Sequence, residues 1–327
     1  MILITGAFGQ VGKILQERLA GKNKLILVDR SFDENFQVDS SSEFMIGDLQ
    51  DIEFVKSIFE KYKIKSIFNL ATNSFVERDK KSELKLKNRC SVFDNIIEAV
   101  TLYCVISETW IFQPLSSEIF GVPNYSPQDL RTNVSPITPY GFQKSTELVK
   151  CRYLNNKGFQ IFHPILYNHE SKYRSLKFFT KKIISSLVKL SKGEEIEIIE
   201  FYNSQSSRDF SYAYDFVDVF VLAMNSNIIG DELIGSGIRM KVIEFIEFAL
   251  EELNISYEIV VNKSNNVLKI VCQDIIIAKE IEQDISDMQR NFCFNGKFKN
   301  SSLNKVKITG GKDLIRKLIL DETSNQK

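Results

Sequence analysis

The chain begins with a short apolar stretch that runs directly into three glycines spaced three residues apart. Ile2–Thr5 has the composition of a buried strand, and Gly6-Ala-Phe-Gly9-Gln-Val-Gly12 leads from it into a helical pattern over Gln10–Ala20. Glycines in such a turn let the backbone approach a pyrophosphate, which the N-terminus of a helix favours electrostatically. A simple strand-to-helix turn would also fit, but the position after the first strand favours dinucleotide binding.

Strand-like and helix-like segments alternate over the first two thirds of the chain. The expected strands are Ile2–Thr5, Leu25–Val28, Phe44–Ile46, Ser66–Leu70, Trp110–Leu115 and Gln160–Leu166. The expected helices are Gln10–Ala20, Ile52–Tyr62, Ser91–Tyr103 and Gly141–Asn156. This alternation predicts an α/β fold of the Rossmann type with a doubly wound parallel sheet. The rhythm changes after about residue 170, so we expect an NAD(P)-binding Rossmann domain over 1–170. Residues 171–327 should form a smaller, mainly substrate-binding region with elements that return to the Rossmann core.

Composition argues against several functional classes. Lys plus Arg and Asp plus Glu both number 42, so no overall charge favours nucleic acid or an anionic membrane. The apolar runs are too short to span a bilayer, and the first residues already resemble a strand, so we expect no signal peptide. The five widely spaced cysteines and two histidines form no metal-binding motif, and they fit a cytoplasmic chain with reduced thiols.

Two acidic residues follow strands at the expected cofactor edge of the sheet. Asp29 ends the second strand, where a carboxylate accepts hydrogen bonds from the ribose of NAD and repels the 2′-phosphate of NADP. Arg30 beside it could instead pair with that phosphate, so NAD and NADP both stay open. Asp48 follows the third strand, and it either meets the adenine amino group or caps the helix that begins at Ile52.

A tyrosine and a lysine four residues apart, Tyr140 and Lys144, lie at the start of the fourth expected helix. Residues with this spacing share one helix face. The ammonium can lower the pKa of the tyrosine, so that the phenol acts as a base toward a substrate hydroxyl. Such a pair is common on helix surfaces, but together with the glycine turn it is a much more specific sign of hydroxyl oxidation.

These motifs resemble the extended short-chain dehydrogenases/reductases, and within that NAD-dependent epimerase/dehydratase group they most resemble the GDP-mannose 4,6-dehydratase family. The resemblance covers about residues 1–225, and Asn168-His-Glu-Ser171 is its most specific element. The other runs that carry it are Thr5-Gly-Ala-Phe-Gly-Gln10, Gly47-Asp-Leu-Gln-Asp51, Ile67-Phe-Asn-Leu-Ala-Thr-Asn-Ser-Phe-Val76, Ser135-Pro-Ile-Thr-Pro-Tyr140 and Ser206-Ser-Arg-Asp-Phe210.

The resemblance, with the patterns above, implies a set of site residues. Catalytic roles fall to Ser116, Glu118, Tyr140 and Lys144, and substrate contacts to Ser116, Ser117, Glu118, Asn168 and Arg208. Cofactor contacts are expected from Gly6, Gly9, Gln10, Val11, Gly12, Asp29, Arg30, Asp48, Leu49, Leu70, Ala71, Asn73, Tyr140, Lys144, His169 and Arg174. Plainer structural roles stay open for two residues: His169 as a satisfied loop histidine, and Arg208 as an ion-pair partner of Asp209.

Two hydroxyl-plus-carboxylate runs compete for the catalytic place beside Tyr140. Ser107-Glu-Thr109 precedes the strand expected from Trp110, whereas Ser116-Ser-Glu118 follows it. Ligands of doubly wound sheets bind beyond the carboxyl ends of the strands. In the family, the catalytic S/T-x-E tripeptide also lies 24 residues before the tyrosine, which is the spacing from Ser116 to Tyr140. Both arguments favour Ser116 and Glu118, and they predict a solvated loop at Ser107–Thr109.

The resemblance implies a nucleotide-sugar 4,6-dehydratase. Tyr140 would take the proton of the sugar C4 hydroxyl as hydride passes to a tightly held, regenerated NAD or NADP, while Ser116 steadies the C4 oxygen. Glu118 would remove the C5 proton, water would leave from C6, and the hydride would return to C6.

The expected partners are a nucleotide sugar, with a GDP-linked hexose favoured, and further copies of the chain in a homodimer or homotetramer, without nucleic acid or membrane. Two alternatives stay open. One is a nucleotide-sugar 4-epimerase, C4 dehydrogenase or decarboxylase, and the other is a cofactor-binding paralogue without catalysis.

The sequence also departs from the family pattern. Phe75 stands where the family carries a histidine, and Asp29-Arg30-Ser31 replaces its arginine pair. Residues 262–327 lack the family's arginine-proline element and its L-G-W-x-P run, which help to recognise the nucleotide and sugar. Pro114 lies inside an expected strand, where it cannot donate a ladder hydrogen bond, so a bulge or an early strand end is expected there.

Overall fold

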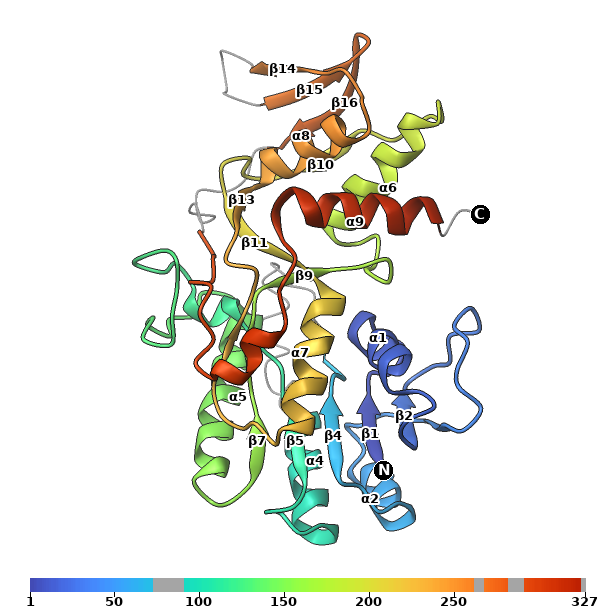
Figure 1. Ribbon diagram of the computed structural model, residues 1–327, viewed down its shortest axis with the longest axis vertical. Coiled ribbons are helices and arrows are strands. Elements are labelled where there is room, and N and C mark those ends of the chain that lie inside the picture. Colours follow the sequence, from blue (N-terminus) through green and yellow to red (C-terminus); the bar gives the residue numbers. More distant parts are fainter. Residues whose placement is uncertain (73–90, 262–267, 282–290, 325–327) are drawn as a thin grey trace.

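The structure is a computed structural model that describes residues 1–72, 91–261, 268–281 and 291–324 (Figure 1). In this part of the chain, six parallel strands form a central sheet in the order β3-β2-β1-β4-β5-β7. They are β1 (Ile2–Thr5), β2 (Leu25–Asp29), β3 (Glu43–Ile46), β4 (Ser66–Asn69), β5 (Trp110–Phe112) and β7 (Gln160–Phe162). The predicted Rossmann-type sheet is confirmed. Its order reverses between β1 and β4, and such a switch point opens a crevice beyond the carboxyl ends of the strands.

Helices cover both faces of the central sheet. One face packs against α1 (Gln10–Leu19) and α7 (Ala213–Asn225). The other packs against α2 (Ile52–Lys61), α4 (Ser91–Tyr103) and α5 (Pro139–Asn155). Successive strand residues point to opposite faces, so Ile2 and Ile4 face the first pair of helices and Leu3 faces the second set. Burial on both faces explains why the strands read as continuous apolar runs.

Two of the expected strands are each split by a proline. The strand expected over Trp110–Leu115 ends at Phe112, and after Pro114 the chain resumes as β6 (Leu115–Ser116). The strand expected over Gln160–Leu166 likewise divides into β7 and β8 (Ile165–Leu166) around Pro164. β8 pairs with β6 on one side and with β12 (Leu233–Ile234) on the other, in a separate three-stranded sheet. The early strand end expected at Pro114 is confirmed, whereas the continuity of the second strand through Pro164 was wrongly predicted, because proline cannot continue the ladder.

The chain after residue 170 builds most of a second region, which lies above the central sheet in Figure 1. Its core packs α6 (Phe179–Ser191), α8 (Val242–Glu252) and α9 (Gly311–Ser324) against a four-stranded sheet. That sheet consists of β10 (Ile199–Phe201), β16 (Ile275–Glu280), β15 (Leu268–Cys272) and β14 (Glu258–Val261). A three-stranded sheet lies between the two regions and contains β13 (Arg239–Lys241), β11 (Ser207–Tyr212) and β9 (Asn168–Glu170).

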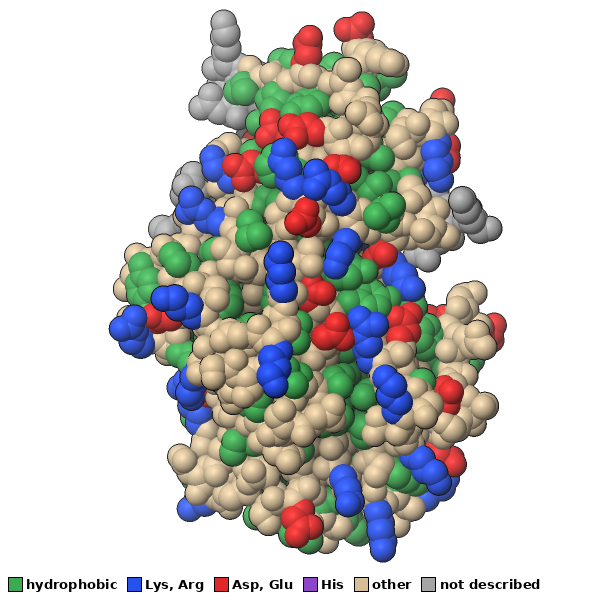
Figure 2. All heavy atoms as spheres, viewed as in Figure 1, with side chains coloured by type: hydrophobic (Ala, Val, Ile, Leu, Met, Phe, Trp, Pro, Cys, Tyr) green, Lys and Arg blue, Asp and Glu red, His purple; other side chains and the backbone are tan. Residues whose placement is uncertain are grey.

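Charged side chains of both signs are interspersed on the face of the molecule seen in Figure 2, with no extended patch of one sign. Within the described residues, no helix combines the length and the apolar character needed to cross a membrane.

Candidate active site

A cavity of about 1030 Å³ lies beyond the carboxyl ends of the central strands, where the second region meets the sheet. Its walls come from the glycine turn after β1, the β6 strand and following residues, α5, β9 and its following loop, β10 and β11. Ligand pockets commonly measure about 300–1000 Å³, so this cavity is wide enough for a large ligand or for two ligands side by side.

The glycine turn is held by close backbone approaches. Gly6 has φ +62°, and a Cβ there would lie 2.9 Å from the Leu70 carbonyl group. A Cβ on Gly12 would lie 2.5 Å from two carbonyl oxygens of the turn, so α1 can start this close only with glycine. Among the described residues no side chain caps α1, whose N-terminal N–H groups border the cavity. This arrangement fits the pyrophosphate of a dinucleotide.

Asp29 anchors the same turn to the end of β2. Its Oδ2 accepts a hydrogen bond from the Phe8 N–H at 2.9 Å, and its Oδ1 accepts one from the Arg30 N–H at 2.8 Å. The side chain of Arg30 is exposed. Neither Asp29 nor Arg30 lines the cavity, so their roles toward the ribose stay predictions.

Asp48 does not cap the helix that follows it. Its Oδ1 accepts from the Gln50 N–H at 2.9 Å, within the turn. The N-cap of α2 is Asp51, whose side chain accepts from the N–H groups of Glu53 and Phe54. The capping alternative for Asp48 is therefore wrong, and its contact with adenine stays a prediction.

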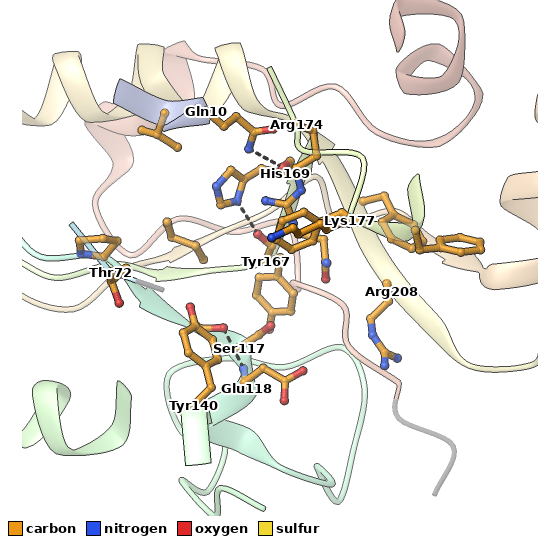
Figure 3. Close-up of a pocket in the computed structure, with 18 of the residues that line it drawn as sticks. Gln10, Thr72, Ser117, Glu118, Tyr140, Tyr167, His169, Arg174, Lys177 and Arg208 are labelled. Atoms are coloured by element: carbon orange, nitrogen blue, oxygen red, sulfur yellow. Dashed lines mark hydrogen bonds between the residues drawn. The ribbon is translucent and has the colours of Figure 1, made fainter. Parts of the chain in front are cut away.

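The catalytic candidates Ser116, Glu118 and Tyr140 come together at one wall of the cavity. Ser116 ends β6, and its Oγ accepts from the Glu118 N–H at 3.3 Å and is hydrogen-bonded to Tyr140. A Cβ on Gly141 would lie 2.5 Å from the Glu118 carbonyl oxygen, so the glycine after Tyr140 lets α5 approach this segment closely. Figure 3 shows Tyr140 and Glu118 together, across the cavity from His169 and Arg174.

Burial and the Lys144 ammonium act on the pKa of Tyr140 in opposite directions. Burial raises its pKa, and the Lys144 ammonium offsets only part of this rise. The Lys144 ammonium is itself paired: its Nζ donates to Glu147 Oε2 at 2.8 Å and to the Pro114 carbonyl oxygen at 2.9 Å. The Glu147 charge itself raises the pKa of Tyr140. Lys144 therefore acts on the pKa of Tyr140 in the predicted direction, but burial outweighs it in the protein alone.

The competing run Ser107–Thr109 lies at the opposite, amino end of β5. Ser107 and Glu108 are exposed, as predicted. Thr109 is buried instead, and its Oγ1 donates to the Val105 carbonyl oxygen at 3.0 Å. The strand direction thus separates this run from the cavity.

His169 on β9 joins the second region to the glycine turn. Its carbonyl oxygen accepts from Gln10 Nε2 at 2.9 Å, and its ring stacks on Phe216 with centroids 4.9 Å apart. Its Nδ1 lies 2.9 Å from the Tyr167 carbonyl oxygen. Burial, with the nearby Arg174 charge, lowers the pKa of His169 to about 4, so its imidazole is neutral near pH 7.

Two arginines also line the cavity. The guanidinium of Arg174 lies 3.5 Å from the ring centroid of Phe178, and its Nε lies 3.2 Å from a Glu170 carboxylate oxygen. Arg208 on β11 lies over the Phe292 ring at 5.1 Å. The carboxylate of its neighbour Asp209 accepts hydrogen bonds from the Ser236–Gly237 turn, on the opposite face of the strand. This geometry does not support the alternative in which Arg208 pairs with Asp209.

The cavity gathers most of the predicted site residues. Those that line it are Gly6, Gly9, Gln10, Val11, Gly12, Leu70, Ser116, Ser117, Glu118, Tyr140, Lys144, Asn168, His169, Arg174 and Arg208. Those that do not are Asp29, Arg30, Asp48, Leu49 and Ala71. Asn73 and Phe75 lie outside the described residues. Sequence reasoning missed Lys177, Lys182, Tyr202 and Asn203, which also line the cavity. The run of closely spaced basic residues after His169 was the sequence signal available for the two lysines.

Comparisons with known proteins bear on the family and the fold of the chain. A family model described as GDP-mannose 4,6 dehydratase matches residues 3–290. The GDP-mannose 4,6-dehydratase of Sinorhizobium fredii is 27% identical over 271 residues, which cover 78% of this chain and 77% of the relative. Among solved structures, a UDP-glucose 4-epimerase of Thermotoga maritima with UDP-glucose has a TM-score of 0.79 at 16% identity, covering 100% of this chain and 99% of that one. A dTDP-glucose 4,6-dehydratase of Bacillus anthracis with NAD has a TM-score of 0.76 at 14% identity, covering 99% and 97%.

Proposed function

Because this chain belongs to the GDP-mannose 4,6-dehydratase family, we propose that it converts a GDP-linked hexose of the mannose type into its 4-keto-6-deoxy form. The chain is an NAD(P)-dependent nucleotide-sugar 4,6-dehydratase of the extended short-chain dehydrogenase/reductase type. The observation that carries the proposal is the meeting of Ser116, Glu118 and Tyr140 at one cavity wall, opposite the glycine turn.

The proposed reaction uses these side chains in order. The chemistry that NAD(P) supplies when bound is to store one hydride between its removal from C4 and its return to C6. Tyr140 takes the proton of the C4 hydroxyl, and Ser116 donates a hydrogen bond to the C4 oxygen. The C4 ketone acidifies the C5 proton, which Glu118 removes. That proton leaves with the C6 hydroxyl as water. When the hydride returns to C6, C5 gains a proton from solvent, and Tyr140 returns to solvent the proton that it took from the C4 hydroxyl.

Basic residues in the cavity lining support a diphosphate-linked substrate. Arg208, Lys177 and Lys182 line the cavity, and guanidinium and ammonium groups bind phosphate oxygens strongly. Tyr202 and Phe178 line the same cavity and offer aromatic surface on which a base could pack. These groups replace, in this proposal, the family's C-terminal arginine element that the chain lacks.

The proposed assembly is a homodimer formed through α5. Phe142, Val149 and Tyr153 are 55%, 65% and 61% exposed, and their spacing puts them on one helix face. Large apolar side chains aligned in this way are typical of a surface that another chain covers. A second copy of this chain is the proposed partner.

The test compares two glutamates that the strand direction separates. Glu118→Gln removes the base for C5, so dehydration should fall by at least about 100-fold, whereas the exposed Glu108→Gln should stay within about twofold. The measurement is mass spectrometry of the product from GDP-mannose and other nucleotide sugars, with NAD and NADP supplied separately, because dehydration removes one water.

Each other outcome contradicts a stated part of the proposal. Full dehydration by Glu118→Gln would overturn the assignment of the base. A product of unchanged mass would favour the 4-epimerase alternative. No conversion of any nucleotide sugar by the wild-type protein would favour the non-catalytic paralogue.

A further inference from the structure

A second carboxylate, Glu147, lies on α5 three residues after Lys144. It is 2% exposed, on the helix face that packs against the sheet, and it does not line the cavity. Buried carboxylates are rare unless their charge is paired and hydrogen-bonded. Glu147 meets both conditions, and one of its hydrogen-bond donors, Lys144, lines the cavity beside Tyr140.

Three side chains donate to this carboxylate. Its Oε2 accepts from Lys144 Nζ and from Gln113 Nε2, each at 2.8 Å. Its Oε1 accepts from Gln143 Nε2 at 2.7 Å. Both oxygens therefore face donors. An amide offers only one acceptor oxygen, so the site selects a carboxylate.

The donors form part of a buried row across the ends of three strands. Gln113 Oε1, just after β5, accepts from Asn69 Nδ2 at 2.7 Å, and Asn69 Oδ1 on β4 accepts from Thr5 Oγ1 at 3.0 Å. Thr5 Oγ1 on β1 in turn accepts from the N–H groups of Leu70 and Ala71 at 3.0 and 3.1 Å. The row fixes Glu147 relative to the sheet and to the segment after β4 that lines the cavity at Leu70.

We propose that Glu147 is a positioning residue for the dehydration, which holds Lys144 charged and directed at the Pro114 carbonyl beside Tyr140. The inference rests on the proposed function. Lys144 is 1% exposed, and an ammonium at this depth without a counter-charge would tend to lose its proton. Glu147 supplies that charge, and the strand break at Pro114 presents the carbonyl oxygen that fixes the other side of the ammonium.

The neighbouring titratable groups decide in which direction the loss of the Glu147 charge shifts the pKa values of Lys144 and Tyr140. They are Tyr140 and Cys151 on α5 and Glu118 from the segment after β6. Burial raises the pKa of the Cys151 thiol well above its ordinary value, so it stays neutral. Burial alone would lower the pKa of Lys144, but Glu147 and Tyr140 more than offset this and raise it. Glu147 also raises the pKa of Tyr140, while Lys144 lowers it.

Glu147→Gln should therefore move the pH profile of kcat toward lower pH. The alkaline limb of the profile requires charged Lys144. It should move to lower pH, because the Glu147 charge no longer offsets the lowering of the Lys144 pKa by burial. The acid limb requires deprotonated Tyr140. As long as Lys144 keeps its proton, this limb should also move to lower pH, because the Glu147 charge no longer raises the pKa of Tyr140. At alkaline pH, kcat should fall by about tenfold or more with KM for the nucleotide sugar within about twofold, since Glu147 does not line the cavity.

Two variants separate positioning from stability. Glu147→Asp keeps the charge and should restore the wild-type pH limbs. Glu232→Gln is the matched control, because Glu232 is also 2% exposed and accepts from three backbone N–H groups outside the cavity. It should lower the melting temperature and leave the pH profile unchanged.

A purely structural Glu147 would behave like this control, and that result would overturn the proposal. A readout without turnover is the pH titration of lysine ammonium groups by NMR, with Lys144→Met identifying the signal. In Glu147→Gln the Lys144 signal should lose its proton at lower pH than in the wild type, and an unchanged titration would overturn the proposal. If the wild type dehydrates no nucleotide sugar, the proposed function fails, while this titration still decides whether Glu147 controls the charge of Lys144.

Discussion

His169 is a single residue whose environment should make the stability of the protein depend on pH. Its pKa is about 4 in the folded chain, against 6.5 for an ordinary histidine, mainly because of burial. Between these values the unfolded chain binds a proton that the folded chain does not. Stability must therefore fall as pH drops through this window, by roughly 2 kcal/mol between pH 7 and pH 5 from this residue.

The measurement is urea unfolding of the wild type and of His169→Asn at both pH values. The asparagine amide can still donate toward the Tyr167 carbonyl oxygen, yet it does not titrate. The loss of stability on acidification should be about 2 kcal/mol smaller in the variant. An equal loss in both proteins would contradict the low pKa of His169.

At the scale of an element, α5 carries Tyr140 and Lys144, and its first turn depends on one side chain. Thr138 is the N-cap, and its Oγ1 accepts from the Gly141 N–H at 3.0 Å. Thr138→Ala should lower the free energy of unfolding by about 1 kcal/mol, measured by urea denaturation, because this N–H loses its partner.

Two matched variants test that interpretation. Thr138→Ser keeps the hydroxyl and should lose less than half as much stability. Thr146→Ala, further along the same helix, removes a hydroxyl that donates to the Phe142 carbonyl oxygen, and its effect should stay within about 0.5 kcal/mol. Equal effects at Thr138 and Thr146 would show that the cap has no special role.

The elements that could be predicted from the sequence are those whose apolar pattern and flanking turns lie within the element itself. β1 and β2 were found because strands buried on both faces read as apolar runs between turns. β14, β15 and β16 were missed, since β14 is exposed along its whole length and β16 pairs with β10, which lies far away in the sequence.

The same distinction separates the site residues. Ser116 and Glu118 were predicted because their place after a strand and their spacing to Tyr140 can both be read from one continuous stretch of sequence. Glu147 was not, because its role depends on Gln113 after β5, which itself accepts a hydrogen bond from Asn69 on β4, as well as on donors from its own helix. Asp51 was missed as a cap because Asp48 and Asp51 both fit the turn before α2, and only the backbone geometry decides between them.

At the scale of the whole molecule, α5 serves two surfaces at once. One side of the helix places Tyr140 and Lys144 in the cavity, and another exposes Phe142, Val149 and Tyr153. A second copy packed on the exposed side would restrict movement of the helix that carries the catalytic pair. Assembly and activity are therefore expected to be coupled through this one element.

A charge in the exposed apolar face should separate the copies. Val149→Glu places a carboxylate where the dimer would bury it, and an unpaired buried charge is strongly unfavourable. Size-exclusion chromatography with light scattering should give twice the chain mass of 37.6 kDa for the wild type and the single mass for the variant. Ile275→Glu, on β16 and 67% exposed, is the matched control and should keep the wild-type mass. If Val149→Glu keeps the wild-type mass, the interface lies elsewhere. If the variant is monomeric and has a lower kcat but an unchanged melting temperature, the second copy supports α5.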